Sequence, residues 1–450
     1  MRESVRPDKT IPLAAEQDGY LGLGRDGHGA VPLCFRVRAR LERPALEQAL
    51  AQVMARHEPL RMRLADTEDG LRQVFPPAGP ADYAVQEIAV PPGSTDLEVA
   101  LDLAVTPSDM RAHGPVRTWL IRVGPDDSTL LVLIDHLATD AWGATVFARE
   151  LLAFYYAEVT GTEPPPLPAV PRYSEFAAAQ HAGAPTWTPA QYKYWRRVIR
   201  DYCAPADRVP PSADLGSPAQ HARSDLLSGL GPEQLAGLTG FARASRVPPR
   251  TVELASLLLA IWTWCPAQAI RVWCTHSGRE DHAIANAVGK YSRSIPLVVR
   301  ADPGASLADF CRDVLRGWSE AVAYSGVPFS SSGMRDLITQ AGGPDPAIPE
   351  VTLNRVFSRG TGAAGGQDPV EYCDLTAARW DWFREPRLRV MSTFDSALSM
   401  RAIFHPGLVP AAFAETVMAN LDRLLPLFVS EHAADSIGDL ADRLSLPTAS

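Results

Sequence analysis

Three titratable side chains lie close together between residues 135 and 140. Asp135 and His136 follow an apolar run, and Asp140 comes four residues after the histidine. A neutral imidazole accepts a proton near pH 7, so His136 is a candidate general base. A histidine beside an apolar strand is more often a buried structural residue, and other motifs along the chain have to decide between these interpretations.

The residues on either side of this cluster predict a strand and a helix. The run from Thr129 to Ile134 is rich in leucine and β-branched residues, which indicates one buried strand. Apolar residues recur at helical spacing from Ala144 to Gly161. Asp140 stands where a helix N-cap belongs. We therefore expect His136 at the end of a rigid strand, just before a helix begins.

The composition excludes several classes of protein. The chain has 450 residues, of which 46% are hydrophobic and 21% charged, as in a soluble globular protein of two to three domains or of two large lobes. Its formal charge of −9 argues against a general nucleic-acid binder, which needs a basic face. The six cysteines contain no CxxC pair, so we expect no metal site and a reducing, cytoplasmic compartment.

Membrane segments and nucleotide loops are also not expected. The first residues lack the apolar core of a signal peptide, and the apolar segment Leu254–Cys265 is too short to cross a bilayer. The chain contains a literal GxGxxG from Gly22 to Gly27, but a helix precedes it and a strand follows. This order is the reverse of a dinucleotide fingerprint, so we interpret the glycines as a turn.

A proline-rich linker at residues 161–171 predicts two lobes, 1–171 and 172–450. A strand, a helix and another strand follow one another between Val31 and Leu64, which indicates an α/β lobe. Helices and strands also mix in the second lobe, which is expected to close with a helix at Pro410–Val429. Two loops rich in Gly and Pro, at 342–349 and 360–369, are expected to be lids or crossovers.

Six short motifs occur in an order that resembles the condensation-domain family of nonribosomal peptide synthetases, within the chloramphenicol-acetyltransferase-like superfamily. The central family motif, HHxxxDG, is present in the variant form DHxxxDA. The resemblance extends over nearly the whole chain. The matching segments are Pro12–Gln17 (PLSxxQ), Arg56–Leu64 (RHExLRxxF), Asp135–Ala141 (HHxxxDG), Ser277–Arg279 (AGR), Gly289–Ser294 (GxFVNT) and Val327–Phe329 (PF).

This resemblance implies an α/β fold of two acetyltransferase-like lobes, arranged as a V-shaped pseudo-dimer around a central tunnel. It implies that His136 is the catalytic histidine. It also implies that Asp140 is structural and pairs with an arginine, either Arg279 or Arg61. Asp135 is expected beside the imidazole, which it either holds or weakens as a general base by raising its pKa, so that more of the ring is already protonated. Three further residues are expected along the tunnel: Trp142, Ser292 and Arg293.

Among the departures of the chain from the family pattern, three concern the chemistry. Asp135 replaces the first histidine of the motif, Ala141 replaces its glycine, and Arg293 replaces the asparagine of GxFVNT. Asp135 and Asp140 together also spell DxxxxD, the signature of heterocyclization domains. Three functions therefore stay open: condensation, heterocyclization, and a module that has lost its chemistry and only recruits carrier proteins or a tailoring enzyme.

The resemblance favours acyl transfer in secondary metabolism, such as antibiotic biosynthesis. An amine or hydroxyl acceptor, small or carrier-bound, attacks a thioester on an acyl or peptidyl carrier protein and forms an amide or an ester. The only cofactor implied is the carrier's phosphopantetheine arm. The chain begins with Met and shows no adenylation or carrier segment, so we expect a stand-alone enzyme. Carrier proteins are usually acidic, which suggests a basic docking patch at Arg196, Arg197 and Arg200.

Overall fold

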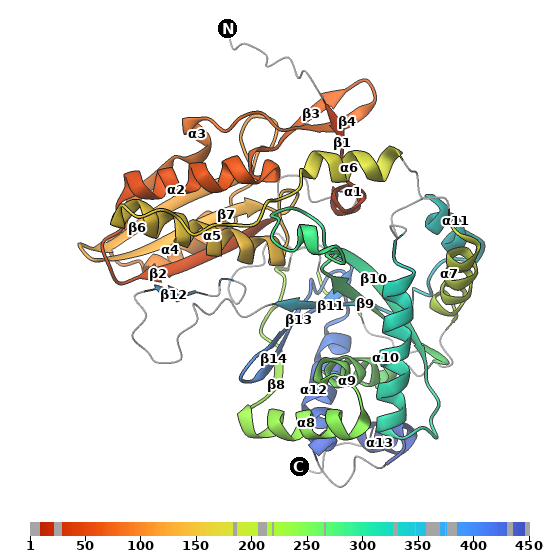
Figure 1. Cartoon of the computed structure of the whole chain (residues 1–450). Helices are drawn as coiled ribbons and strands as arrows, with labels where there is room; N and C mark the ends of the chain where they lie inside the picture. The colour runs from red at the N-terminus through yellow and green to blue at the C-terminus, as the bar shows by residue number, and fades with distance from the viewer. Residues whose placement is uncertain are drawn as a thin grey trace. The chain divides into compact units, whose positions relative to one another are not determined.

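The computed structural model (Figure 1) describes most of the chain as two compact units. The first unit comprises Met1–Pro185, Ser277–Ser292 and Arg359–Arg379, and the second comprises the remainder. The predicted boundary at residue 171 differs from this division because α6 (Tyr173–Ala182) packs on β1 (Ile11–Pro12) of the first unit. The described residues are 10–21, 29–182, 187–205, 214–217, 220–264, 267–326, 332–346, 348–356, 370–373, 375, 385–429 and 435–445.

The first unit contains a five-stranded sheet in the order β12-β2-β7-β6-β5 and a three-stranded sheet in the order β1-β4-β3. Its strands are β1 (Ile11–Pro12), β2 (Ala30–Val37), β3 (Arg63–Thr67), β4 (Gly70–Val74), β5 (Val85–Ala89), β6 (Val116–Gly124), β7 (Asp127–Asp135) and β12 (Val370–Tyr372). Its helices are α1 (Ala15–Leu21), α2 (Arg43–Arg56), α3 (Pro80–Tyr83), α4 (Asp96–Ala104), α5 (Ala141–Thr160) and α6 (Tyr173–Ala182).

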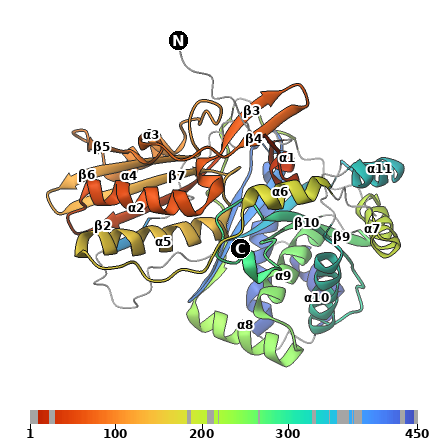
Figure 2. The same cartoon turned by 45° about the horizontal axis from the view of Figure 1, so that its top comes forward.

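Side chains of β7 alternate between two apolar layers. Leu130, Val132 and Ile134 join the core that includes residues of α2 and α5. Leu131 and Leu133 face the opposite way and pack with Ala100 of α4. The sheet is therefore covered on both faces, and α2 and α5 lie side by side over one of them in Figure 1 and Figure 2. This double burial explains why β7 is apolar at every position from Leu130 to Ile134 rather than alternating in sequence.

The second unit contains a six-stranded mixed sheet in the order β10-β9-β11-β13-β14-β8. Its strands are β8 (Leu227–Leu230), β9 (Ala269–His276), β10 (Arg293–Arg300), β11 (Glu350–Val356), β13 (Arg387–Phe394) and β14 (Leu398–Ile403). Its helices are α7 (Pro189–Tyr202), α8 (Pro232–Ser245), α9 (Pro249–Trp264), α10 (Leu307–Ala323), α11 (Ser332–Gln340), α12 (Ala411–Leu424) and α13 (Ile437–Ser445).

The α/β class and the elements around His136 are confirmed. Other expectations were incomplete: the helix expected before the GxGxxG stretch is α1, which follows the short strand β1, and β6, β8 and α11 were not anticipated. The turn at 22–27, the loop at 360–369 and the PF element at 327–329 lie outside the described residues. The V-shaped arrangement and the tunnel stay predictions. Within the part of the chain that is described, no helix is both long and apolar enough to span a membrane.

The packing of α5 on the sheet gives a first prediction. Phe147 is fully buried in the core, whereas Tyr156 on the same helix is 66% exposed. Phe147→Ala is expected to lower the free energy of unfolding by about 3–5 kcal/mol because it leaves a cavity. Tyr156→Ala is expected to stay within about 0.5 kcal/mol. Urea denaturation measures both, and equal losses would contradict this packing.

Candidate functional site

His136 is the first residue after β7, and backbone hydrogen bonds fix its position. Its N–H donates to the carbonyl of Gly29 at 2.9 Å, while the preceding N–H of Asp135 donates to Pro115 at 2.8 Å. Ala138 N–H then donates to the Asp135 carbonyl and closes a tight turn. The histidine therefore leaves the end of a sheet strand, as the sequence predicted.

The imidazole has a defined tautomer. Nδ1 of His136 lies 2.7 Å from the carbonyl oxygen of Thr139. A carbonyl oxygen can only accept, so Nδ1 carries the hydrogen, and in the neutral ring Nε2 carries the lone pair. The ring of Tyr20 lies 5.0 Å away, at 52° to the imidazole. The ammonium of Lys290 lies 5.9 Å from the centre of the same tyrosine ring.

A buried glutamine supports the same turn from the other side. Gln17 is fully buried, and its Nε2 donates to the carbonyl of Leu137 at 2.9 Å and to Gln73 at 3.2 Å. Its Oε1 accepts from the N–H of Ala14 at 2.8 Å. Gln17 is the last residue of the PLSxxQ-like segment. This segment was recognised in the sequence, but its contact with the residue after His136 was not.

Asp140 caps the N-terminus of α5 and accepts four hydrogen bonds. Oδ1 accepts from the N–H of Gly143 at 2.8 Å. Oδ2 accepts from Arg279 at 2.8 Å and from the backbone N–H groups of Tyr291 and Ser292 at 3.0 and 2.9 Å. Burial opposes ionisation of this carboxyl group, but Arg279 and the Gly143 N–H outweigh it, so the pKa of Asp140 lies below its usual value.

Arg279 holds the whole segment 277–292 together beside α5. Its side chain is 2% exposed and donates to the carbonyls of Ser277 and Ala287 as well as to Asp140. Its guanidinium also lies 4.8 Å from the centre of the Tyr291 ring. Arg61, the other arginine considered for this role, lies elsewhere and donates to the backbone carbonyls of Phe75 and Pro76.

Glycine is required at a different position from the one the motif suggested. The family glycine corresponds to Ala141, the first residue of α5. A Cβ atom added to Gly143 would lie 2.7 Å from Thr139 Oγ1 and 3.2 Å from the backbone nitrogen of Gly289. The close approach of α5 to the segment 277–292 therefore depends on Gly143.

The Asp135 carboxylate is buried and serves the backbone. Oδ1 accepts from the N–H of Leu137 at 2.9 Å, and Oδ2 accepts from the hydroxyl of Ser108. Only 5% of the residue is exposed. These contacts hold the turn after β7. They give Asp135 a role that neither of the expected effects on the imidazole had anticipated.

The three residues expected along a tunnel occupy different places. Trp142 on α5 is 37% exposed and donates from Nε1 to the Ala285 carbonyl at 2.7 Å. Ser292 is buried and accepts from Lys290 at 2.9 Å through its hydroxyl. Arg293 is the first residue of β10 in the second unit. Trp142 thus contacts the segment 277–292, and Ser292 is the last residue of that segment.

Another histidine, which is buried where His136 is only partly so, was missed as a separate feature. His57 accepts from the Val288 N–H at Nδ1, which leaves Nε2 to donate to Glu150 at 2.9 Å. Glu150 is fully buried and also accepts from Arg56. Burial opposes its ionisation, but these two hydrogen bonds hold the pKa of Glu150 below its usual value. Both nitrogens of His57 are engaged within the protein, which marks it as a structural residue.

The amino-acid sequence of this chain is similar to those of known proteins. The family model described as "Condensation domain" matches residues 23–333. A probable non-canonical nonribosomal peptide synthetase, CymA of Salinispora arenicola, is 28% identical over 345 residues, which are 73% of this chain and 4% of CymA. The chain thus spans a small part of this curated relative.

Solved structures resemble the chain over almost their whole length. SgcC5 from Streptomyces globisporus matches with a TM-score of 0.73 and 21% identity, over 92% of this chain and 99% of that one. The X-domain in its complex with OxyB from teicoplanin biosynthesis matches with a TM-score of 0.74 and 19% identity, over 97% of each chain. At these identities the likeness establishes the fold alone.

The pairing of Asp140 with Arg279 gives a second prediction. Asp140→Asn leaves a buried guanidinium without its counter-charge and should lower the free energy of unfolding at pH 7 by about 3–5 kcal/mol. Because the folded pKa of Asp140 is depressed, its contribution is complete above the unfolded pKa of about 3.9 and is lost as the pH falls below that value.

Urea unfolding of the wild type and Asp140→Asn at several pH values measures this effect. The stability difference between them should shrink as the pH falls below about 4. Asp66→Asn serves as the control, because Asp66 also pairs with an arginine but is exposed. A difference that does not change with pH would contradict the assigned ionisation of Asp140.

Proposed function

Because the chain belongs to the condensation-domain family, we propose that it transfers an acyl group from the pantetheine thioester of a carrier protein to an amine or hydroxyl acceptor, forming an amide or an ester. The observation that carries this proposal is the hydrogen bond from Nδ1 of His136 to the Thr139 carbonyl. It presents Nε2 as a base at the end of a rigid strand.

One proton is transferred twice in the proposed reaction, first to His136 and then to the leaving sulfur. The acceptor nitrogen or oxygen attacks the thioester carbonyl carbon, and Nε2 of His136 takes the proton that the acceptor loses. The tetrahedral intermediate then collapses, the carbon–sulfur bond breaks, and the imidazolium returns the proton to the pantetheine sulfur. The products are an amide or ester and a free thiol. A general base of this kind contributes roughly 10²–10⁴-fold to the rate.

Positioning of the two substrates contributes more than the base. Holding an acceptor and a thioester in reactive geometry can supply about 7 kcal/mol or more of the barrier reduction. The proposed base, His136, is also held in a fixed position. The His136 ring is fixed through Thr139 and Tyr20, and the turn that carries it is fixed through Gln17. Little reorganisation of the base is then needed during the reaction.

The contacts of Asp135 argue against heterocyclization. Heterocyclization would require the DxxxxD carboxylates to act on the substrate. Instead, Asp135 is bound to Leu137 and Ser108, and Asp140 is bound to Arg279 and three backbone N–H groups. Both carboxylates therefore stabilise the turn and the helix that carry His136.

A recruitment module is the second candidate function. The observation in its favour is the likeness to an X-domain that is described in complex with OxyB. The chain also departs from the family at Asp135, Ala141 and Arg293. In this case the protein would bind a carrier protein or a tailoring enzyme and would form no product.

Product analysis with His136→Ala tests the proposed function. An acyl-loaded carrier protein, or an acyl-pantetheine mimic, is mixed with a panel of amines and alcohols, and the products are identified by mass spectrometry. Loss of the base should reduce the rate by about 10²–10⁴-fold. Asp135→Asn is the matched control, since an amide can replace the carboxylate beside Leu137, and it should retain most of the activity.

Other results would contradict the role of His136 or favour a different function. Equal rates for the wild type and His136→Ala would rule out His136 as the base. A wild-type product that is lighter by one water, together with loss of activity in Asp135→Asn, would favour heterocyclization. Saturable carrier binding by a wild type that forms no product would favour recruitment. Thermal melts of all three proteins exclude unfolding as the cause.

A further inference from the structure

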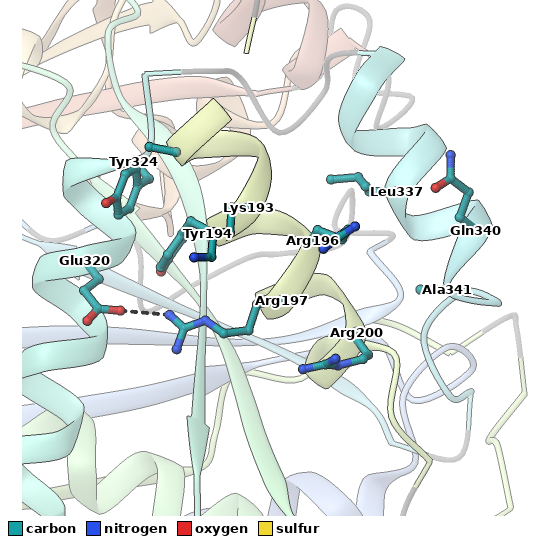
Figure 3. Close-up of a pocket in the computed structure, with 11 residues that line it drawn as sticks. Lys193, Tyr194, Arg196, Arg197, Arg200, Glu320, Tyr324, Leu337, Gln340 and Ala341 are labelled. Atoms are coloured by element: carbon teal, nitrogen blue, oxygen red, sulfur yellow. Dashed lines mark hydrogen bonds and ion pairs between the residues drawn. The ribbon is translucent and has the colours of Figure 1, made fainter. Parts of the chain in front are cut away.

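A basic groove lies on the second unit, over helix α7 and beside helices α10 and α11 (Figure 3). Its volume is about 1000 Å³. Four cationic side chains of α7 line it at positions i, i+3, i+4 and i+7, which places them along one face of the helix. These cations are Lys193, Arg196, Arg197 and Arg200.

The charge of the groove contrasts with that of the whole chain, which is −9. Glu320 is the one carboxylate among the described lining residues, and it lies 3.0 Å from Arg197. Nε of Arg200 lies 3.8 Å from Oδ1 of the neighbouring Asp201, and the arginine side chain is 72% exposed. Among the described residues, no carboxylate forms an ion pair with Lys193 or Arg196. The groove therefore has a surplus of positive charge.

The bottom of the groove is aromatic and apolar. The rings of Tyr194 and Tyr324 are stacked with their centres 4.6 Å apart. Leu337 of α11 is 4% exposed and packs in the same apolar cluster as Tyr194. Figure 3 shows Tyr194 and Tyr324 on the side of α7 that faces α10, and Leu337 on the side that faces α11. A ligand seated here meets apolar groups as well as the positive charges of α7.

The exposed cations favour an extended partner over a small molecule. A small-molecule pocket buries most of its ligand, whereas all four cations of this groove are exposed at the surface. From Lys193 to Arg200 the stripe rises about 10 Å along the helix. Carboxylates placed three and four residues apart on another helix have the same spacing as these cations. Apolar side chains next to those carboxylates would reach Tyr324 and Leu337.

We propose that this groove is a docking site for an acidic amphipathic helix of a partner protein. The partner helix lies along α7, its carboxylates meet Arg196 and Arg200, and its apolar edge packs on the stacked tyrosines. This is the helix-in-groove mode of recognition, with charge complementarity giving the orientation. The inference extends the docking patch expected from the sequence, because it adds Lys193, the stacked tyrosines and a helical partner, and the groove does not depend on any chemistry at His136.

A synthetic peptide tests the groove directly. The probe is a fluorescein-labelled helical peptide of about 20 residues, with glutamates along one face and leucines beside them. Fluorescence anisotropy measures its binding to the full chain. We expect saturable binding that weakens with added salt, and at least a tenfold loss of affinity in the double variant Arg196→Glu/Arg200→Glu. A peptide with glutamine in place of glutamate should bind at least tenfold more weakly.

The matched control reverses two arginines on other helices of the same unit. Arg243 on α8 and Arg316 on α10 are exposed, and neither lines the groove. The variant Arg243→Glu/Arg316→Glu changes the net charge equally and should keep the wild-type affinity. Thermal melts verify folding. Transfer from a small acyl-pantetheine donor should be the same in both double variants, which separates docking from chemistry at His136.

Four results would overturn the proposal. They are the absence of saturable binding to the wild type, equal binding of the glutamine peptide, equal loss of affinity in both double variants, and displacement of the peptide by an oligothymidylate that binds more tightly. The last result would assign the groove to a nucleic acid instead. If the protein shows no transfer activity at all, the peptide measurement still decides the docking site.

Discussion

The buried ion pair between Asp140 and Arg279 is the interaction on which the candidate site depends. Removing two charges from water is costly, and the cost is offset here because every oxygen of the carboxylate is hydrogen-bonded. The pair does more than cap a helix. It fixes the start of α5 against the segment 277–292, and Thr139, the residue just before Asp140, supplies the carbonyl that orients His136.

The contacts around His136 are therefore of two kinds: some hold the backbone of the turn, and others hold the imidazole ring. Asp135, Asp140 and Gln17 contact backbone groups on both sides of the histidine and determine where the turn lies. Tyr20 and Thr139 contact the imidazole itself. With the carboxylates engaged by the backbone and Arg279, the substitution of Asp135 for the first histidine of the motif changes the support of the turn. The hydrogen bond to Thr139 determines that Nδ1 carries the hydrogen in the neutral ring.

The local part of the site could be predicted from the sequence. The strand, the cap and the helix around His136 follow from the spacing of residues that are neighbours in the chain. Arg279 could be reduced to one of two candidates only through the resemblance to a family. The contacts of Tyr20, Lys290 and Gln17 could not be predicted, because they join segments far apart in sequence and carry no periodic signal. For the same reason β12, which pairs with β2, was not anticipated.

The distance along the chain between Asp140 and Arg279 also has a consequence for biosynthesis. The two residues are 139 positions apart, and much of the second unit lies between them. At the usual rate of translation the ribosome needs on the order of ten seconds to make that stretch. During this interval Asp140 has emerged without its counter-charge. The first unit therefore gains this ion pair only after part of the second has been synthesised, and until then the turn that carries His136 lacks this anchor.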